Sequence, residues 1–228
     1  MKLITMQVAL FSKDIISRPD KMKDEIEQKM GGSIFDAMPL ILSLPSDVPS
    51  DLPIVQAKSV SGRYALNISR MRIDFFVNPD YENNDDPLTT FNTYKSSVEK
   101  FYKAVTSQTE ISRIGIVFTL FENNAESVRA IYDKYLKTSF NAKCVEVTVR
   151  YNVQKQVKGL LLNNIRVIEA GNLHIDRNGT GEDKKGVIIQ LDTNNVPSIQ
   201  NKLTNDNIAT VIMSAIKNLE PNEIREMV

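Results

Sequence analysis

The sequence is poor in the residues that metal and thiol chemistry require. Its 228 residues include one cysteine, Cys144, and one histidine, His174. A single cysteine excludes an intramolecular disulfide, and together the two residues exclude sites built from several histidine or cysteine ligands. Zinc hydrolases and most thiol-dependent enzymes therefore do not match this sequence, and we expect no bound metal.

The common signatures of nucleotide binding and hydrolysis are also missing. There is no GxxxxGK[ST] motif, no GxGxxG motif after a strand, and no GxSxG, HExxH or CxxC motif. Each of these motifs supplies a part that its chemistry needs, such as a phosphate cradle or an exposed nucleophile. The sequence therefore favours a non-enzymatic protein without a cofactor.

Long apolar runs and an excess of one charge are absent as well. No window approaches the roughly 18 uninterrupted apolar residues of a membrane-spanning helix, and the N-terminal residues 1–11 lead into a charged SKD instead of a cleavage site. We expect a cytoplasmic protein. The 28 basic residues balance the 28 acidic ones, which argues against an overall basic field but leaves a local basic patch possible.

Alternating apolar residues occur twice, 110 positions apart, with the same phase. Such period-2 patterns predict strands that are buried on one face. The first set of apolar positions is Ile4, Met6, Val8 and Leu10, and the second is Ile114, Ile116, Phe118 and Leu120. Each segment is followed by a predicted helix, over residues 19–30 and about 123–136.

The rest of each half repeats one order of elements. In the first half, strands over 54–60, 63–69 and 71–77 form an antiparallel meander with Ser61-Gly62 as a hairpin signal, and a helix follows over 88–105. In the second half the predicted strands cover 144–153, 159–169 and 186–192, and a helix capped by Thr204 follows.

We therefore expect an α+β fold built from a duplicated β-α-β-β-β-α unit, with mostly antiparallel sheets and helices packed on one face. The expected copies are residues 1–107 and 108–228, which form one compact two-lobed domain. The alternative remains open, because many α+β chains show some self-similarity.

Two segments between the predicted elements have compositions typical of loops. The run LPSDVPSDLP over 44–53 contains three prolines and predicts a stiff, extended connection, with a proline-rich docking motif as an alternative. The stretch 172–185 contains Asn178-Gly179-Thr180-Gly181 and is typical of a mobile loop. Its Asp176, Asn178 and Thr180 resemble the start of a calcium loop, but Val187 stands where the bidentate acid would be.

Four arginines are the candidate binding residues. Each alternates with the apolar residues of its predicted strand and is therefore expected to point away from the core. Guanidinium groups recognise phosphates and carboxylates through planar, paired hydrogen bonds. Structural ion pairs offer the alternative, since Asp74 and Glu146 share the phase of neighbouring arginines. The four residues are Arg63, Arg72, Arg113 and Arg150.

Part of the chain resembles a sporadically distributed bacterial family of uncharacterised proteins of about this length. The resemblance covers roughly residues 55–121, with an echo at 186–192, and depends on the runs GRYALNIS (62–69), RIDFF (72–76) and ISRIGI (111–116). That family has no assigned catalytic residues. Its patchy distribution implies genes that travel with mobile elements or phage-defence clusters.

The favoured function is a cytoplasmic binding or assembly protein that acts through protein–protein contacts, as a homo-oligomer or as a subunit of a complex. The second hypothesis is a nucleic-acid-associated protein that uses the arginine-bearing sheet face. The third is a ligand-binding protein or enzyme with Glu146, Asp74 or His174 as acid or base.

Overall fold

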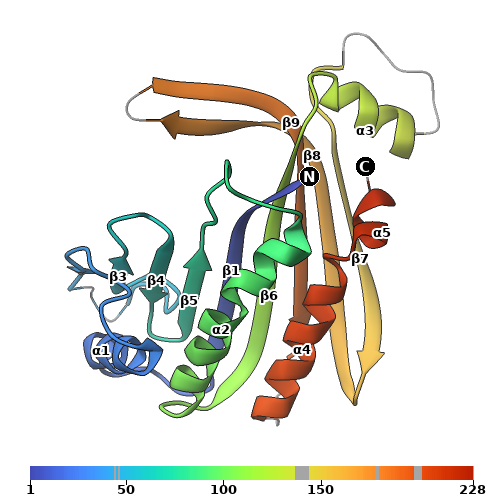
Figure 1. The fold of residues 1–228 in the computed structure, drawn as a ribbon. Helices are drawn as coiled ribbons and strands as arrows, with labels where there is room; N and C mark the ends of the chain where they lie inside the picture. Colours follow the sequence, from blue (N-terminus) through green and yellow to red (C-terminus); the bar gives the residue numbers. More distant parts are fainter. Residues whose placement is uncertain (44, 46, 137–143, 178–179, 198–201, 228) are drawn as a thin grey trace.

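The protein is an α+β protein, as the sequence predicts. In the computed structural model, residues 1–43, 45, 47–136, 144–177, 180–197 and 202–227 are described. Over these residues the chain forms one antiparallel sheet of nine strands and five helices (Figure 1). No helix within these ranges is long and apolar enough to cross a membrane.

The first half of the chain supplies five strands and two helices close to the predicted positions. The two-residue strand β2 is the one element that the sequence pattern did not indicate. The strands are β1 (Lys2–Ser12), β2 (Leu40–Ile41), β3 (Val55–Lys58), β4 (Tyr64–Ile68) and β5 (Arg72–Val77), and the helices are α1 (Pro19–Met30) and α2 (Pro87–Thr106).

The second half supplies four strands and three helices. The sequence pattern does not indicate the short helix α5, which Pro221 opens in its first turn. The strands are β6 (Ile111–Asn123), β7 (Thr148–Val157), β8 (Leu160–Arg177) and β9 (Thr180–Asn195), and the helices are α3 (Ser127–Tyr135), α4 (Asn205–Lys217) and α5 (Pro221–Arg225).

The two halves meet at the centre of the sheet. The strand order is β2-β3-β4-β5-β1-β6-β9-β8-β7, so β1 and β6 pair antiparallel in the middle. In each half the last strand, β5 or β9, pairs with the first, β1 or β6. The sheet is therefore continuous across the two halves.

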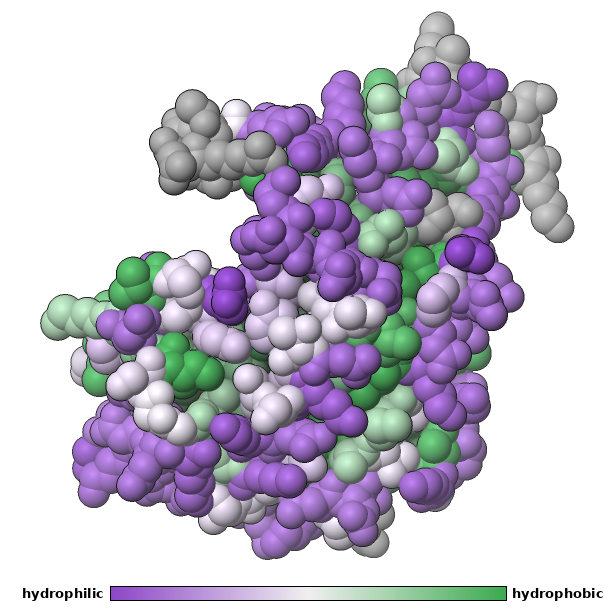
Figure 2. All heavy atoms as spheres, in the orientation of Figure 1, coloured by the Kyte–Doolittle hydropathy of each residue, from purple (hydrophilic) through white to green (hydrophobic). Residues whose placement is uncertain are grey.

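All five helices pack on one face of this sheet. Phe91 of α2 meets Phe118 of β6 with ring centroids 5.7 Å apart, and Phe101 stacks on Phe75 of β5 at 4.9 Å. The strand residues that face the helices are almost fully buried, because apolar side chains alternate on that side. Figure 2 shows the outer surface of this helix-bearing side, which is largely hydrophilic with smaller hydrophobic patches.

The helix boundaries follow local chemistry. Pro19 opens α1, and Gly31 closes it in the left-handed conformation (φ 112°), which glycine adopts without steric cost. The Thr204 hydroxyl accepts a hydrogen bond from the Asn207 N–H at 3.1 Å and so caps α4, as predicted. Asp86 caps α2 by accepting from the N–H groups of Leu88 and Thr89, both at 3.1 Å.

The expected extended connection over 44–53 is wrong in part. Within the described part of this segment the chain turns, and the Leu52 N–H donates to the Pro49 carbonyl at 3.2 Å. Proline fixes φ near −65°, which suits a tight turn as well as an extended chain. Residues 44 and 46 lie outside the described residues.

Strand β7 begins four residues later than predicted and continues to Val157. The alternating valines of this segment predict a face that is buried in a core, but Val145 is 87% exposed and Val153 is 54% exposed, whereas Val147 is buried. This exposure arises because the neighbouring helices pack on other strands. Helix α3 contacts β8 and β9, and α4 contacts β6 and β9. Most of the helix-side surface of β7 is therefore left open.

The predicted mobile loop over 172–185 is wrong. β8 and β9 continue as a paired hairpin to Arg177 and Thr180, and the pairs from Asn172–Lys185 onward extend past the ends of both neighbouring strands. We call residues 172–177 and 180–185 the arm. Figure 1 shows the arm projecting from the body of the molecule. Its second strand is polar throughout, and only Leu173 and Ile175 alternate with polar residues in the first, so the apolar signal of a strand is short and sits beside the turn-forming residues near Gly179.

A pair of glycines marks the base of the arm. Gly171 of β8 lies opposite Gly186 of β9. A Cβ atom at Gly186 would stand 2.1 Å from the backbone oxygen of Glu122 and 2.5 Å from the Phe121 ring, and one at Gly171 would meet the Ile188 side chain at 2.5 Å. At Gly186 the clash is with backbone, so glycine is required there, whereas at Gly171 the clash is with the flexible end of the Ile188 side chain.

We expect Gly186→Ala to lower the free energy of unfolding by about 1–3 kcal/mol, since backbone must move to admit the methyl group. The matched control is Gly115→Ala in β6, where the nearest atom to a new Cβ is 3.7 Å away. Urea denaturation of both variants checks this. Equal stability of the two would contradict the close approach at Gly186.

The helix cap formed by Asp86 should make the stability of the protein depend on pH. A hydrogen bond from the Thr89 side chain, followed by its backbone N–H, lowers the pKa of Asp86. The cap therefore stabilises the fold above the unfolded-state pKa of about 4 and loses this contribution as pH falls through the lower folded-state pKa. We expect Asp86→Ala to cost about 1 kcal/mol at neutral pH and less in acid, with Asp86→Asn retaining most of the cap. Urea denaturation across this pH range measures the difference.

Candidate functional site

The candidate site is the face of the sheet that carries no helix among the described residues, which we call the open face. Its side chains alternate with the buried ones along every strand. In β1, for example, Val8 and Leu10 are buried under the helices, whereas Gln7 and Phe11 point to the open face and are partly exposed. Polar, aromatic and small residues share this surface.

Residues from all nine strands align in one transverse row on the open face. Register pairs connect each member to the next, so the row crosses the sheet at right angles to the strands. Two small residues occupy the centre, and amide or carboxylate side chains flank them. From the β7 edge the row is Gln154, Asn163, Asn194, Gly115, Ala9, Asp74, Asn67, Gln56 and Leu40.

Hydrogen bonds join the second-half side of this row. Asn163 Oδ1 accepts from the amide groups of Asn152 and Gln154, both at 3.0 Å, and Asn163 Nδ2 donates to Asn194 Oδ1 at 3.1 Å. Asn194 then donates to Asp192 Oδ1 at 2.9 Å. These hydrogen bonds hold the side chains of Asn163 and Asn194 in place on the open face.

The first-half side of the row is fixed around Asp74. Its Oδ1 accepts from Gln7 Nε2 at 2.8 Å and from Arg72 Nε at 3.0 Å. Asp74 is only 8% exposed, so the Arg72 guanidinium and the Gln7 amide satisfy a carboxylate that would be costly to bury alone. Arg72 is therefore partly committed to an internal ion pair.

An aromatic ring lies between two of the predicted arginines. Phe11 pairs with Arg72 on one side and Arg113 on the other, and the two guanidinium carbons lie 5.1 and 5.0 Å from its ring centroid. Arg113 donates to Asn194 Oδ1 at 3.4 Å, but its buried Nε has no hydrogen-bond partner. No carboxylate of the described residues forms an ion pair with Arg113.

The other two predicted arginines lie elsewhere. Arg150 is exposed on the open-face side of β7, three strands from Arg113. Arg63 stands in the turn before β4, and its charge opposes the rise that burial produces in the pKa of Tyr94 on α2. Arg63, in the turn before β4, and Arg150, on the edge strand β7, both lie apart from Phe11, so the structure brings two of the four arginines together and separates the others.

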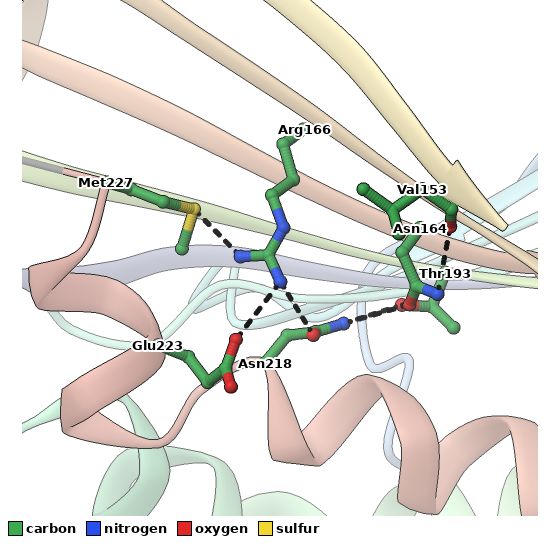
Figure 3. A network of polar contacts seen from close by, with 7 residues as sticks. All are labelled: Val153, Asn164, Arg166, Thr193, Asn218, Glu223 and Met227. Carbon is green, nitrogen blue, oxygen red and sulfur yellow. Dashed lines mark hydrogen bonds and ion pairs between the residues drawn. The ribbon is translucent and has the colours of Figure 1, made fainter. Parts of the chain in front are cut away.

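A second polar cluster, whose residues are not among the predicted site residues, lies between β8 and the C-terminal helices (Figure 3). Arg166 Nη2 donates to Asn218 Oδ1 at 3.1 Å and pairs with Glu223 at 3.3 Å. Asn218 Nδ2 donates to Thr193 Oγ1 at 3.0 Å and to Asn164 Oδ1 at 3.3 Å. The cluster borders a groove of about 420 Å³ between β7, β8 and α4.

The Arg166 cluster attaches α5 to the sheet. The Arg166 side chain is mostly buried, and both of its terminal nitrogens have partners, because Nη1 also contacts Met227 Sδ at 2.9 Å. A signal for this cluster exists in the sequence: Asn164 and Arg166 interrupt the apolar phase of β8 between Leu162 and Ile168, which are both buried. Buried polar residues in such a phase require partners.

The three residues considered as acids or bases lie far apart in the structure. Asp74 lies on β5 and Glu146 precedes β7, five strands away, which is on the order of 24 Å at the usual strand spacing. His174 is on the arm, where its Nδ1 lies 2.7 Å from Asp183 Oδ1. Cys144 Sγ contacts the Glu146 carbonyl at 3.2 Å, ahead of β7.

No group of three or more potential metal ligands occurs within the ranges described. The calcium-like segment includes Asn178, which lies outside the described residues. What the open face provides chemically is a fixed array of amide, guanidinium and aromatic groups suited to binding.

Comparisons with protein-family models and with curated protein sequences find no match to the chain.

We expect Asn194→Ala to destabilise the protein by about 1–3 kcal/mol, because Asn194 is 1% exposed and its loss leaves the Asn163 amide and Arg113 without an acceptor. The control is Asn152→Ala at the exposed end of the same chain of contacts, which should cost less than about 0.5 kcal/mol. Thermal and urea unfolding measure both. A cost at position 152 as large as at 194 would contradict the order of burial.

Proposed function

We propose that the protein is a non-enzymatic binding protein that acts through protein–protein contacts and that the open face is its contact surface. The observation that carries this proposal is the transverse row, in which hydrogen-bonded side chains cross a sheet face free of helices over the described residues. Side chains that are already ordered lose little conformational freedom when a partner binds.

The charge of the open face supports a protein partner over a polyanion. Arg72, Arg113 and Arg150 share this face with the carboxylates Asp74, Asp192 and Glu169. Similar numbers of both signs, combined with partly exposed apolar side chains, are typical of protein interfaces. A nucleic-acid surface would carry a marked excess of positive charge.

The expected duplication belongs to the same proposal. It is supported by the strand order, because reading outward from the centre gives β1-β5-β4-β3 in one half and β6-β9-β8-β7 in the other. In both halves a helix follows the first strand and another follows the last. The proposed units, 1–107 and 108–228, would then present one shared binding surface in a single two-lobed domain.

The cellular setting is also part of the proposal. The protein would act in the cytoplasm as a homo-oligomer or as a subunit of a complex. The resemblance over residues 55–121 supports a gene in a mobile-element or phage-defence locus, and a neighbouring nuclease, toxin or phage operon would agree with it. An isolated position among genes of central metabolism would argue against it.

Affinity capture from the source cells tests the contact surface. Val117 is half-buried at the middle of the open face beside Gln7 and Asp192, so Val117→Lys should abolish capture of a stoichiometric protein partner. Met213→Lys on the exposed side of α4 is the control and should capture it as the wild type does. Equal capture by all three, or capture by none, would overturn the proposal.

Nucleic-acid binding is the second candidate function, favoured by the Phe11 arrangement. A ring flanked by Arg72 and Arg113 offers stacking and phosphate contacts side by side. Arg113 forms no ion pair with a carboxylate of the described residues, so its charge remains uncompensated for an anion that approaches this face.

Fluorescence anisotropy with single-stranded and duplex DNA and RNA over a salt series tests this candidate. If it holds, affinity falls steeply with salt, and Arg113→Gln weakens binding and reduces the salt slope by about one. Arg129→Gln on α3, away from the open face, should leave both unchanged. Absent or salt-insensitive binding would remove nucleic acid as the ligand.

A further inference from the structure

The two edges of the sheet differ. At one edge β2 has two residues, whereas at the other β7 has ten, with no proline, glycine or register shift. Tyr151 and Val153 on this strand are exposed large apolar residues. A long, regular and partly apolar edge strand is a template for pairing with another strand.

The backbone groups that β7 leaves free can be identified. Val147 O accepts from the Ala170 N–H at 3.4 Å, and Val153 O accepts from the Asn164 side chain at 3.3 Å, so both carbonyls point to β8. Backbone groups alternate in direction along a strand. The N–H and C=O groups of residues 148, 150, 152, 154 and 156 therefore point away from the sheet.

We infer that a second copy of this chain docks on the β7 edge, with the two β7 strands antiparallel about a twofold axis at Asn152. This inference rests on the proposed assembly function and names the partner. The outward groups of Asn152 then bond to those of the second Asn152, and those of Arg150 bond to Gln154 of the second copy. The two sheets become one, and the axis keeps both open faces on the same side.

Side chains in this register are self-complementary. Tyr151 lies opposite Val153 of the second copy, and the twofold axis forms this aromatic–β-branched pair twice, which covers exposed apolar surface. Just beyond each end of the strand, the same register brings the backbone of Glu146 opposite that of Lys158, the first residue of the β7–β8 turn (φ 47°), in the second copy, so opposite charges come close. No two like charges face each other: Arg150 faces Gln154, and Lys155 faces Val149.

A proline substitution separates docking from folding. Because the Asn152 N–H points outward, Asn152→Pro removes no backbone hydrogen bond within the monomer, but it removes the central donor of the dimer. The side-chain bond to Asn163 is lost equally in Asn152→Ala, which serves as the control. Sedimentation velocity over a concentration series should give a dimer for the wild type and for Asn152→Ala, and a monomer for Asn152→Pro with unchanged circular dichroism.

Charge reversal provides an independent measurement if the proline variant fails to fold. Glu146→Lys or Lys158→Glu alone places like charges opposite each other at both ends and should raise the dimer dissociation constant about threefold or more. The double variant restores opposite pairing and should return the constant to near the wild-type value. Additive weakening in the double variant would contradict the register.

Cross-linking tests the axis directly. In a Cys144→Ser background, Asn152→Cys should form a disulfide-linked dimer on mild oxidation, since the axis brings position 152 to its own copy. Gln156→Cys would lie opposite Thr148 and should not cross-link.

A wild-type protein that stays monomeric at every concentration, or a dimer unaffected by both Asn152→Pro and charge reversal, overturns the inference. Neither result touches the capture experiment on the open face, so the failure of one proposal is distinguishable from the failure of the other.

Discussion

The antiparallel pairing of β1 with β6 is the constraint on which the rest of the structure depends. It joins the two halves along eleven- and thirteen-residue strands and so makes one sheet where two could have formed. Once the sheet is continuous, helices from both halves share a single side, and α2 and α4 contact each other over the centre. The opposite side is then a single surface to which both halves contribute.

Elements with a covered apolar face were predictable from the sequence. Proline at the first turn and glycine after the last located α1 closely, and clear alternation located β4 and β5, because each signal reflects local backbone chemistry or one-sided burial. The arm was missed for the complementary reason. Its two strands pair only with each other and do not face the core, so their apolar phase is limited to Leu173 and Ile175.

The candidate site was partly predictable. Strand phase placed Arg72 and Arg113 on the helix-free side, but no pattern along the chain could align Gln154, Asn194 and Asp74 in one row, because that alignment depends on register between strands distant in sequence. Alternation predicts the direction of a side chain only within a strand. Arg63 lies in a turn outside its strand, so its direction could not be predicted in this way.

The paired glycines at the base of the arm have a consequence for how this protein can diverge. Beyond Gly171 and Gly186 the hairpin has neither β6 nor β7 beside it. Residues added or removed there in matched pairs would alter its reach by about 3.4 Å per pair without shifting any register in the body. Relatives of this chain can thus differ in hairpin length while retaining the same sheet.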